Sequence, residues 1–252
     1  MLELLAPAGN LDAVIAAVQN GADAVYMGFG DGFNARRSAD NFTQESFAKA
    51  VRYCHIRGCK VYVTLNTLVG DREMDAAAAL AQQASDAGAD AILVQDLGLA
   101  RVLRAALPDI PLHASTQMSI HNLAGVEAAA EMGITRAVLA RELSLEQIRF
   151  ISQHASIETE VFVHGALCVS YSGQCYLSAA LSGRSANRGE CAQYCRLPYS
   201  LIDADGKEIV SGKHLLSLKD MNRGEYLEEL LDAGVSSLKI EGRLKDVSCL
   251  LY

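Results

Sequence analysis

A short repeating unit sets the strongest limit on the fold of this chain. In each copy a glycine closes a helical stretch, and a short apolar strand begins within a few residues of it. Glycine suits this place because it adopts the left-handed backbone conformation that closes the last turn of a helix. The instances are Gly21 before AVYMGF, Gly58 before KVYVTLN, Gly88 before AILVQD, Gly133 before RAVLARE and Gly234 before SSLKIEG. The unit predicts strands and helices that alternate along the chain.

This pattern predicts eight strands, which start near residues 2, 24, 60, 91, 112, 136, 158 and 236. Amphipathic helical stretches lie between them, including residues 11–20, 45–57, 74–87, 123–132 and 144–155. The alternation is typical of an α/β fold, the TIM-type (β/α)8 barrel, and 252 residues suffice for one such domain. A Rossmann-like sheet is the alternative, but no GxGxxG motif follows the first strand. We therefore predict a single barrel domain over residues 1–252.

The spacing between the seventh and eighth predicted strands departs from this rhythm. Most strands start about 20 to 35 residues apart, whereas the last interval runs from about residue 158 to about residue 236. We expect an insertion over residues 166–212, made of a cysteine-rich loop and a β-hairpin, YSLIDADGKEIV, that turns at Asp205-Gly206. Loops that follow strands form the functional face of such barrels, so the insertion should lie over the mouth.

The end of the chain is too short for a complete eighth helix. After SLKIEG only RLKDVSCLLY remains. We expect the eighth helix to be truncated, which would leave one face of the first and eighth strands uncovered.

Four cysteines in the insertion indicate a metal site. Cys168, Cys175, Cys191 and Cys195 are separated by seven, sixteen and four residues, among many glycines and serines. Such a segment cannot be one regular helix or strand, and a folded loop can bring the four thiols together. Four thiolates select zinc or an iron–sulfur cluster. A zinc-stapled surface loop without catalytic function is the alternative interpretation.

Composition narrows the class of protein. No apolar run approaches the ~20 residues that span a bilayer, and the N-terminus lacks the features of a signal peptide, so we expect a cytoplasmic protein without a membrane partner. In that reducing compartment cysteines favour metal or redox chemistry over disulfides. The formal charge of −8 (22 basic minus 30 acidic residues) argues against nucleic-acid binding over the whole surface, but is compatible with a local basic mouth.

Polar residues gather where the predicted strands end. The site candidates are Arg36, Asn66, Gln117, Arg141, Glu142, His164, Glu241 and Arg243, and Gln95, His113, Ser115 and Lys239 accompany them. We expect three of these arginines, with Arg184, Arg188 and Arg196 of the insertion, to form a basic mouth. Arginine forks suit carboxylates and phosphates. The alternatives are that Arg141 only pairs with Glu142 or Asp96, and that His164 is structural rather than a base or a partner of the metal site.

The sequence carries no hydrolase signature. No GxSxG elbow and no HExxH motif occur. Ser115 and His113 lie two residues apart on one predicted strand, which is a poor geometry for a catalytic triad. A peptidase therefore lacks a recognisable catalytic set in these residues.

The segment HGALCVSYSGQC resembles the signature of the U32 family, labelled as collagenase-like peptidases. The resemblance continues through ELLAPAGN, GADAVYMG, FNARRSADNF, HASTQMS, VLARELSL, GRSANRGECAQYCRLPYSL, HLLSLKDMN and KIEGRLKD, and so covers nearly the whole chain. It implies a fold similar to a TIM barrel, in agreement with the repeat. The segments GRSANRGEC and CRLPYSL are most similar to the branch that hydroxylates a cytidine of 23S ribosomal RNA.

The resemblance implies oxygen-independent C5-hydroxylation of an RNA pyrimidine that depends on a [4Fe–4S] cluster and on prephenate. It implies Cys168, Cys175, Cys191 and Cys195 as cluster ligands; where some relatives have a ligand after the LKD segment this chain has Met221-Asn222, so Cys195 takes that role. Ribosomal or transfer RNA would be the partner of the full-length protein. We assign catalytic roles to Arg141, Glu142 and His164. Substrate binding falls to Arg36, Asn66, Gln117, Glu241 and Arg243, with arginines holding a dicarboxylate co-substrate. A U32-type peptidase and a non-catalytic metal-stapled scaffold are the alternative functions.

Overall fold

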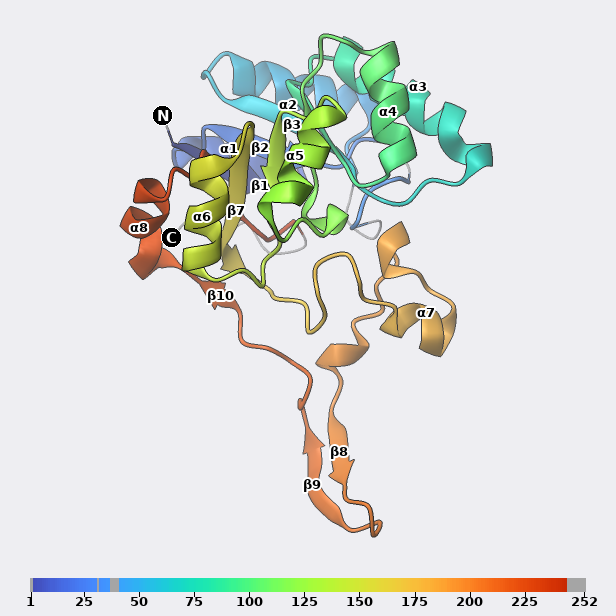
Figure 1. The fold of residues 1–252 in the computed structure, drawn as a ribbon. Helices are drawn as coiled ribbons and strands as arrows, with labels where there is room; N and C mark the ends of the chain where they lie inside the picture. Colours follow the sequence, from blue (N-terminus) through green and yellow to red (C-terminus); the bar gives the residue numbers. More distant parts are fainter. Residues whose placement is uncertain (1, 31, 37–40, 244–252) are drawn as a thin grey trace.

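Eight parallel strands close into a barrel (Figure 1) in the computed structural model, which describes residues 2–30, 32–36 and 41–243. The strands follow one another around the ring in chain order, and the last lies between the seventh and the first. They are β1 (Glu3–Pro7), β2 (Ala24–Met27), β3 (Lys60–Leu65), β4 (Ala91–Val94), β5 (Leu112–Ala114), β6 (Arg136–Val138), β7 (Glu158–Gly165) and β11 (Ser237–Ile240). The predicted (β/α)8 barrel is confirmed, and each predicted strand start lies within one residue of the observed one.

Helices on the outside of the barrel connect the strands. They are α1 (Leu11–Gln19), α2 (Gln44–His55), α3 (Met74–Asp86), α4 (Leu97–Ala106), α5 (Leu123–Glu131), α6 (Leu145–His154) and, before β11, α8 (Leu227–Asp232). Most begin behind a polar residue whose side chain accepts a first-turn backbone N–H, which fixes the start of the helix. These caps are Asn10, Thr43, Asp96, Asn122 and Ser144. The predicted truncation of the eighth helix concerns residues 244–252, which lie outside the described residues.

The five glycines of the repeating unit all close helices with positive φ angles, as predicted. These residues are Gly21, Gly58, Gly88, Gly133 and Gly234. After α2, for example, the Cys59 N–H donates to the Cys54 carbonyl over 3.0 Å and the Gly58 N–H donates to the His55 carbonyl over 3.0 Å. Both bonds satisfy carbonyls at the helix end and turn the chain directly into β3.

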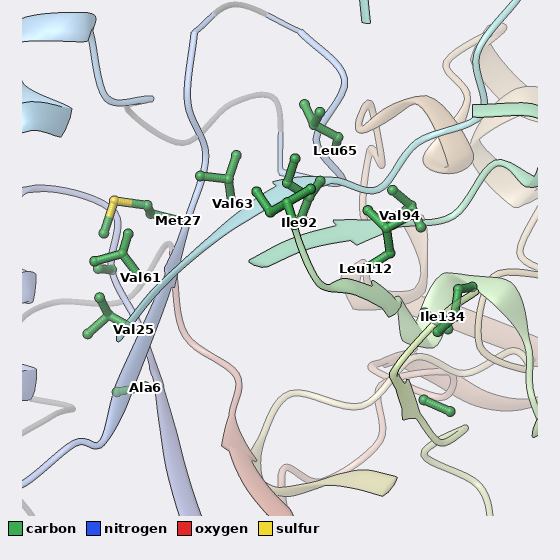
Figure 2. Close-up of a cluster of buried hydrophobic side chains, with 14 of the residues drawn as sticks. Ala6, Val25, Met27, Val61, Val63, Leu65, Ile92, Val94, Leu112 and Ile134 are labelled. Atoms are coloured by element: carbon green, nitrogen blue, oxygen red, sulfur yellow. The ribbon is translucent and has the colours of Figure 1, made fainter. Parts of the chain in front are cut away.

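Alternate residues of each strand face two different cores. On β3, Val61, Val63 and Leu65 lie in the outer core between strands and helices, which Figure 2 shows with Val25 and Ile92. Side chains that face the barrel axis form a second, smaller core, and two-residue alternation is what a strand with two buried faces produces. Its members are Leu5, Ala24, Tyr26, Tyr62, Ala91, Leu93, Val138, Phe162 and Met221.

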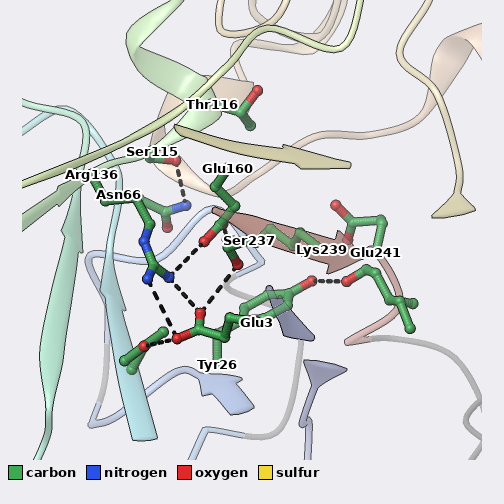
Figure 3. Close-up of polar contacts among 12 residues, drawn as sticks. Glu3, Tyr26, Asn66, Ser115, Thr116, Arg136, Glu160, Ser237, Lys239 and Glu241 are labelled. Atoms are coloured by element: carbon green, nitrogen blue, oxygen red, sulfur yellow. Dashed lines mark hydrogen bonds and ion pairs between the residues drawn. The ribbon is translucent and has the colours of Figure 1, made fainter. Parts of the chain in front are cut away.

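A buried ion network fills the amino-terminal end of the barrel (Figure 3). The Arg136 guanidinium contacts the carboxylates of Glu3 and Glu160, the latter over 3.3 Å, and Lys239 Nζ lies 2.8 Å from Glu160 Oε1. The Tyr62 hydroxyl donates to Glu3 over 2.6 Å. Burial raises the pKa of Glu3, but hydrogen bonds from Arg136 and Tyr62 outweigh this and hold the pKa below its ordinary value. Opposite charges thus compensate one another where water is excluded.

The chain between β7 and β11 leaves the barrel as a long excursion. It forms α7 (Leu177–Ser182), then the antiparallel hairpin of β8 (Tyr199–Ile202) and β9 (Glu208–Lys213), and returns as β10 (Met221–Asn222), which pairs with the end of β7. The hairpin turns at Gly206, where φ is +82°, as predicted. Figure 1 shows it projecting away from the barrel. None of the helices in the described ranges is long and apolar enough to cross a membrane.

The ion network should dominate the stability of the barrel. Replacing Arg136 with Met leaves the buried carboxylate of Glu3 without its close cation and removes one of the two cations beside Glu160, so we expect the free energy of unfolding in urea to fall by about 3–5 kcal/mol. Lys49→Ala is the control, because Lys49 and Glu45 form an exposed pair one helical turn apart. It should cost less than about 0.5 kcal/mol. A loss for Arg136→Met as small as that of the control would contradict the assignment.

Candidate active site

Glu241 lies at the mouth of the barrel, directly after β11, between arginines from two other elements. Arg141 Nη2 is 2.5 Å from Glu241 Oε2, and Arg36 Nη2 is 3.5 Å from Glu241 Oε1. Arg141 also donates to the Ala166 carbonyl over 2.8 Å, and its guanidinium stacks 3.9 Å above the centre of the Phe162 ring. The pairing differs from the predicted alternatives, because Arg141 neither pairs with Glu142 nor with Asp96 among the described contacts.

Arg243 completes the group from the segment after β11. Its side chain is buried, and Nη1 donates to Thr64 Oγ1 over 2.8 Å. Its backbone is held equally closely, because a Cβ at Gly9 would lie 2.4 Å from the Arg243 carbonyl oxygen. The Tyr26 hydroxyl donates to the neighbouring Ile240 carbonyl over 2.8 Å. We call Arg36, Arg141, Arg243 and Glu241 the arginine cluster.

The arginine cluster carries unused capacity to bind an anion. Three arginines against one glutamate leave a formal charge of +2. Burial raises the pKa of Glu241, but the charges of Arg36, Arg141 and Arg243 outweigh it and lower this pKa to about 2. The Nε atoms of Arg141 and Arg243 are buried without a hydrogen-bond partner among the described groups. Such donors cost free energy unless a ligand satisfies them, and carboxylate and phosphate oxygens fit them best.

A neutral wall lies on the side of the mouth formed by β3, β4 and β5. Asn66 donates to Ser115 Oγ over 3.1 Å (Figure 3) and accepts from the Ala35 N–H over 2.9 Å, which positions the loop that carries Arg36. Gln95 is buried, and its Oε1 has no described partner. Amides and hydroxyls of this kind can hydrogen-bond a neutral polar group such as a nucleobase.

The cysteine-bearing segment is fastened to the barrel next to Arg141. Glu142 accepts hydrogen bonds from the N–H and the hydroxyl of Ser172, each over 2.9 Å, and contacts His121. Burial raises the pKa of Glu142, but the bonds from Ser172 and His121 outweigh this and lower the pKa. One residue further on, a Cβ at Gly173 would lie 2.1 Å from the Gln117 carbonyl oxygen. The structure thus places Glu142 in an anchoring position.

Two arginines predicted for the basic mouth fasten the segment elsewhere, which corrects that part of the expectation. Arg188 makes a two-point contact with Glu73, 2.5 and 2.7 Å long. Arg196 donates to Ser217 and to the carbonyls of Leu218 and Leu167. Both satisfy groups of the fold, while Arg184 is exposed on the segment. Arg188 and Arg196 therefore do not belong to the arginine cluster.

The four cysteines of the segment influence one another electrostatically. Burial raises the pKa of the Cys168 thiol, and the neighbouring thiols of Cys175, Cys195 and Cys191 raise it further. Cys168 and Cys191 also contribute to raising the pKa of Arg36, which relates the thiols to the arginine cluster. All four are free of disulfides. Within the part of the chain that the structure describes, no three His, Cys, Asp or Glu side chains form a ready metal site. The all-thiol donor set nevertheless fits zinc or an iron–sulfur cluster chemically.

Other predicted residues lie apart from the arginine cluster. His164 is exposed at the end of β7, and Gln117 lies beneath Gly173, half-exposed; neither side chain takes part in the cluster's described hydrogen bonds. Lys239 and His113 point to the opposite end of the barrel, Lys239 to Glu160 and His113 to Tyr62. Both residues lie within their strands, Lys239 two residues before Glu241 and His113 two residues before Ser115, and only side chains at or beyond the carboxyl ends reach the mouth. Sequence reasoning missed Tyr26, Thr64, Ser172 and His121 as supports of the site.

Fold and site together define an α/β-barrel protein with an arginine-rich mouth beside a cysteine-bearing loop. The chain belongs to peptidase family U32, whose family model matches residues 9–250.

Named relatives of the chain fall into two groups, proteins named for RNA hydroxylation and proteins named as proteases. The "23S rRNA 5-hydroxycytidine C2501 synthase" of Escherichia coli (strain K12) is 49% identical, over 98% of this chain and 37% of its own length. The "tRNA hydroxylation protein P1" of Bacillus subtilis (strain 168) is 40% identical, over 97% of this chain and 59% of its own. A "Collagenase" of Porphyromonas gingivalis (strain ATCC BAA-308 / W83) is 36% identical, over 96% and 61%. The chain thus spans between about a third and three fifths of these relatives.

Solved structures support the same fold. The U32 peptidase Mk0906 superposes with a TM-score of 0.59 at 15% identity, over 95% of this chain and 92% of that one. A phosphoenolpyruvate phosphomutase from Streptomyces platensis subsp. rosaceus gives a TM-score of 0.52 at 14% identity, over 95% and 76%. At such identities the likeness shows the barrel fold alone.

Protonation of Glu241 should be visible in the pH dependence of stability. Its folded-state pKa is depressed from 4.5 to about 2, so its contribution is complete above pH 4.5 and is lost as the pH falls towards 2. We expect Glu241→Gln to lower the free energy of unfolding by about 3 kcal/mol at neutral pH, and this difference should shrink below pH 4.5. Urea titrations of both proteins test this, with the exposed Glu131→Gln as control. A difference that stays constant down to pH 2 would contradict the assignment.

Close contact at Gly173 should control how the cysteine segment docks. Gly173→Ala requires both a strained positive φ and a clash with the Gln117 carbonyl, whereas Gly183→Ala meets only the strain, because nothing lies within 4 Å there. We expect Gly173→Ala to release the segment, so that trypsin cleaves after Arg184 and Arg188 at least several-fold faster than in Gly183→Ala. Equal cleavage rates in the two variants would show that the contact does not hold the segment.

Proposed function

We propose that this chain is the barrel of an iron–sulfur-dependent, oxygen-independent RNA hydroxylase that acts on C5 of a pyrimidine, most closely a cytidine of 23S ribosomal RNA, with prephenate as co-substrate. The relatives named for rRNA and tRNA hydroxylation support RNA as the substrate. The observation that carries the proposal is the arginine cluster, with its formal surplus of positive charge and two buried Nε donors without described partners. We propose RNA binding for the whole protein, because these relatives are longer than this chain.

In this proposal the arginine cluster holds the carboxylates of the co-substrate. Prephenate is a dicarboxylate, and three guanidinium groups around one carboxylate can bind two more. Arg36 and Arg141 approach from the loops after β2 and β6, and Arg243 lies deeper. Guanidinium groups can therefore contact a bound carboxylate from several directions. Glu241 keeps the guanidinium groups together while the ligand is absent. Arg141, which touches both Glu241 and the segment that carries the cysteines, has the central binding role.

The neutral wall would receive the target base. A base must leave its stack to reach such a site, and a single-stranded region makes this least costly. Gln95 and Asn66 carry amide groups directly after β4 and β3, and the unpartnered Oε1 of Gln95 is available to an amino or imino donor of the base. Replacing the C5 hydrogen with hydroxyl is a two-electron oxidation, so without O2 an electron acceptor and an oxygen donor are required. We assign both requirements to the co-substrate: its C–OH bond would break as the C5–OH bond forms, and the hydrogen lost from C5 would replace the hydroxyl, so that the co-substrate is reduced by two electrons.

Cys168, Cys175, Cys191 and Cys195 would hold the [4Fe–4S] cluster, which supplies electron-transfer capacity when bound. Their residues lie on a segment fastened at Ser172 and at Arg188, so both halves of the ligand set are tied to the barrel. Zinc in the same thiols would supply only a structural clasp, which is the non-catalytic alternative. The roles of Glu142 as anchor and of His164 as an exposed base candidate at the end of β7 remain part of the proposal.

Peptidase activity is the second candidate, since one relative is named a collagenase. Among the described residues no serine or cysteine side chain is hydrogen-bonded to a histidine, which is the arrangement that nucleophilic proteolysis uses. The mouth presents arginines and amides instead. These groups favour binding of an anion and a base over attack on a peptide.

Binding of prephenate to this chain tests the proposal. We expect Arg141→Gln to weaken binding about 10–100-fold, since a charged hydrogen bond contributes roughly 1.5–3 kcal/mol. Isothermal titration calorimetry on anaerobically purified protein measures this, with Arg184→Gln, an exposed arginine of the cysteine-bearing segment, as control. Iron and sulfide analysis should find a cluster that survives Arg141→Gln and is depleted by Cys195→Ser. Stoichiometric zinc, or prephenate affinity indifferent to Arg141, would contradict it.

A further inference from the structure

The β8–β9 hairpin and its flanks, residues 197–218, form an arm that stands clear of the barrel (Figure 1). It carries a large share of the exposed apolar side chains of the described residues, several of them about half accessible. They are Leu197, Leu201, Ile202, Ile209, Leu215, Leu216 and Leu218. An isolated two-stranded hairpin is marginally stable in water, and exposed apolar groups of this density mark interaction surfaces. The arm is therefore built to be covered.

The two edges of the arm differ in how they are protected. β9 has two register irregularities against β8, a positive φ at Gly212 and a charge at each end, Glu208 and Lys213. Bulges and charges are the devices that keep edge strands from pairing. β8 reads Tyr-Ser-Leu-Ile, with neither charge nor proline within the strand. Its outer edge is therefore open for pairing with another strand.

Charge along the arm is polarised. The tip carries Asp203, Asp205 and Glu208 against one lysine, Lys207. The root carries Arg196, Lys213 and Lys219 against Asp220, and the described contacts of Arg196 are with a hydroxyl and two carbonyls rather than a carboxylate. An acidic tip and a basic root are complementary to a second arm that runs in the opposite direction.

We propose that the arm pairs with the arm of a second copy of this chain, β8 antiparallel to β8 across a two-fold axis. Pairing with Ser200 opposite Ser200 of the second copy sets Tyr199 of each copy against Leu201 of the other, on one face of a four-stranded sheet. Aromatic–aliphatic pairs across strands stabilise such sheets. The same arrangement sets each acidic tip beside the basic root of the other arm, and a two-fold interface uses one surface twice.

Edge variants test which strand is used. Leu201 and Ile209 are equally exposed, at 52% and 53%, but lie on β8 and β9 respectively. By analytical ultracentrifugation at micromolar concentrations we expect a dimer for the unaltered chain and for Ile209→Lys, and a monomer for Leu201→Lys. The barrel's urea midpoint should be the same in all three, because the arm lies outside its cores. A monomeric unaltered chain, or loss of the dimer in both variants, would overturn the proposal.

Charge reversal tests the direction of the arms. Asp205→Lys with Glu208→Lys makes the tip basic, and Lys213→Glu with Lys219→Glu makes the root acidic. At low salt each double variant alone should dimerise about tenfold more weakly, because like charges meet at both ends, whereas an equimolar mixture should form a heterodimer. Failure of the mixture to associate would exclude the antiparallel arrangement. Loss of RNA affinity in Leu201→Lys, with a monomeric unaltered chain, would assign the arm to RNA instead.

Discussion

The arrangement of side chains at the mouth of this barrel depends on the ion pairs of Glu241. A carboxylate in a nearly dry site is unfavourable alone, and three guanidinium groups from three separate elements compensate it. The loop after β2 is drawn to this point through Arg36 and the loop after β6 through Arg141, whereas Arg243, on the same segment as Glu241, adds its charge while it donates to Thr64. A neutral residue at this position would leave three like charges to repel one another. One side chain therefore organises a site that the backbone alone would leave open.

The position of the cysteine segment depends on contacts with Arg141 and Glu142. Arg141 donates to the Ala166 carbonyl, and its own N–H donates to Ser172 Oγ over 3.2 Å, so the residue that contacts Glu241 also contacts the segment near both of its first two cysteines. Glu142, the next residue, holds Ser172 from the other side. A change at Arg141 is thus coupled to the placement of the thiols through two hydrogen bonds. In the proposed function, this coupling would link binding of the carboxylate co-substrate to the position of the cluster ligands.

Much of this architecture is legible in the sequence, for local reasons. Glycine at the end of a helix and a short apolar run are determined by neighbouring residues, so Gly58 and KVYVTLN predict α2 and β3 without tertiary information. Arg36, Arg141 and Arg243 were predictable as a group because side chains after barrel strands converge. Arg188 and Arg196 were not, since their partners Glu73 and Leu167 are distant in sequence or are backbone carbonyls. Lys239 was wrongly expected at the mouth, because it lies only two residues before Glu241. Lys239 is still within β11, whereas Glu241 follows the strand.

The barrel contains two polar layers that are built from the same residue types but have different roles. In the amino-terminal layer, Arg136 and Lys239 face Glu3 and Glu160, so two positive charges meet two negative charges and the layer is balanced without help. In the layer at the mouth three arginines face one glutamate, and two of their buried donors lack a described partner. Leu5, Leu93, Val138 and Phe162 lie within the barrel as an apolar core. A balanced layer stabilises the fold, whereas an unbalanced one is complete only when an anion joins it. The imbalance of charge, more than the presence of charged residues, is therefore the reason for proposing the mouth as the binding site.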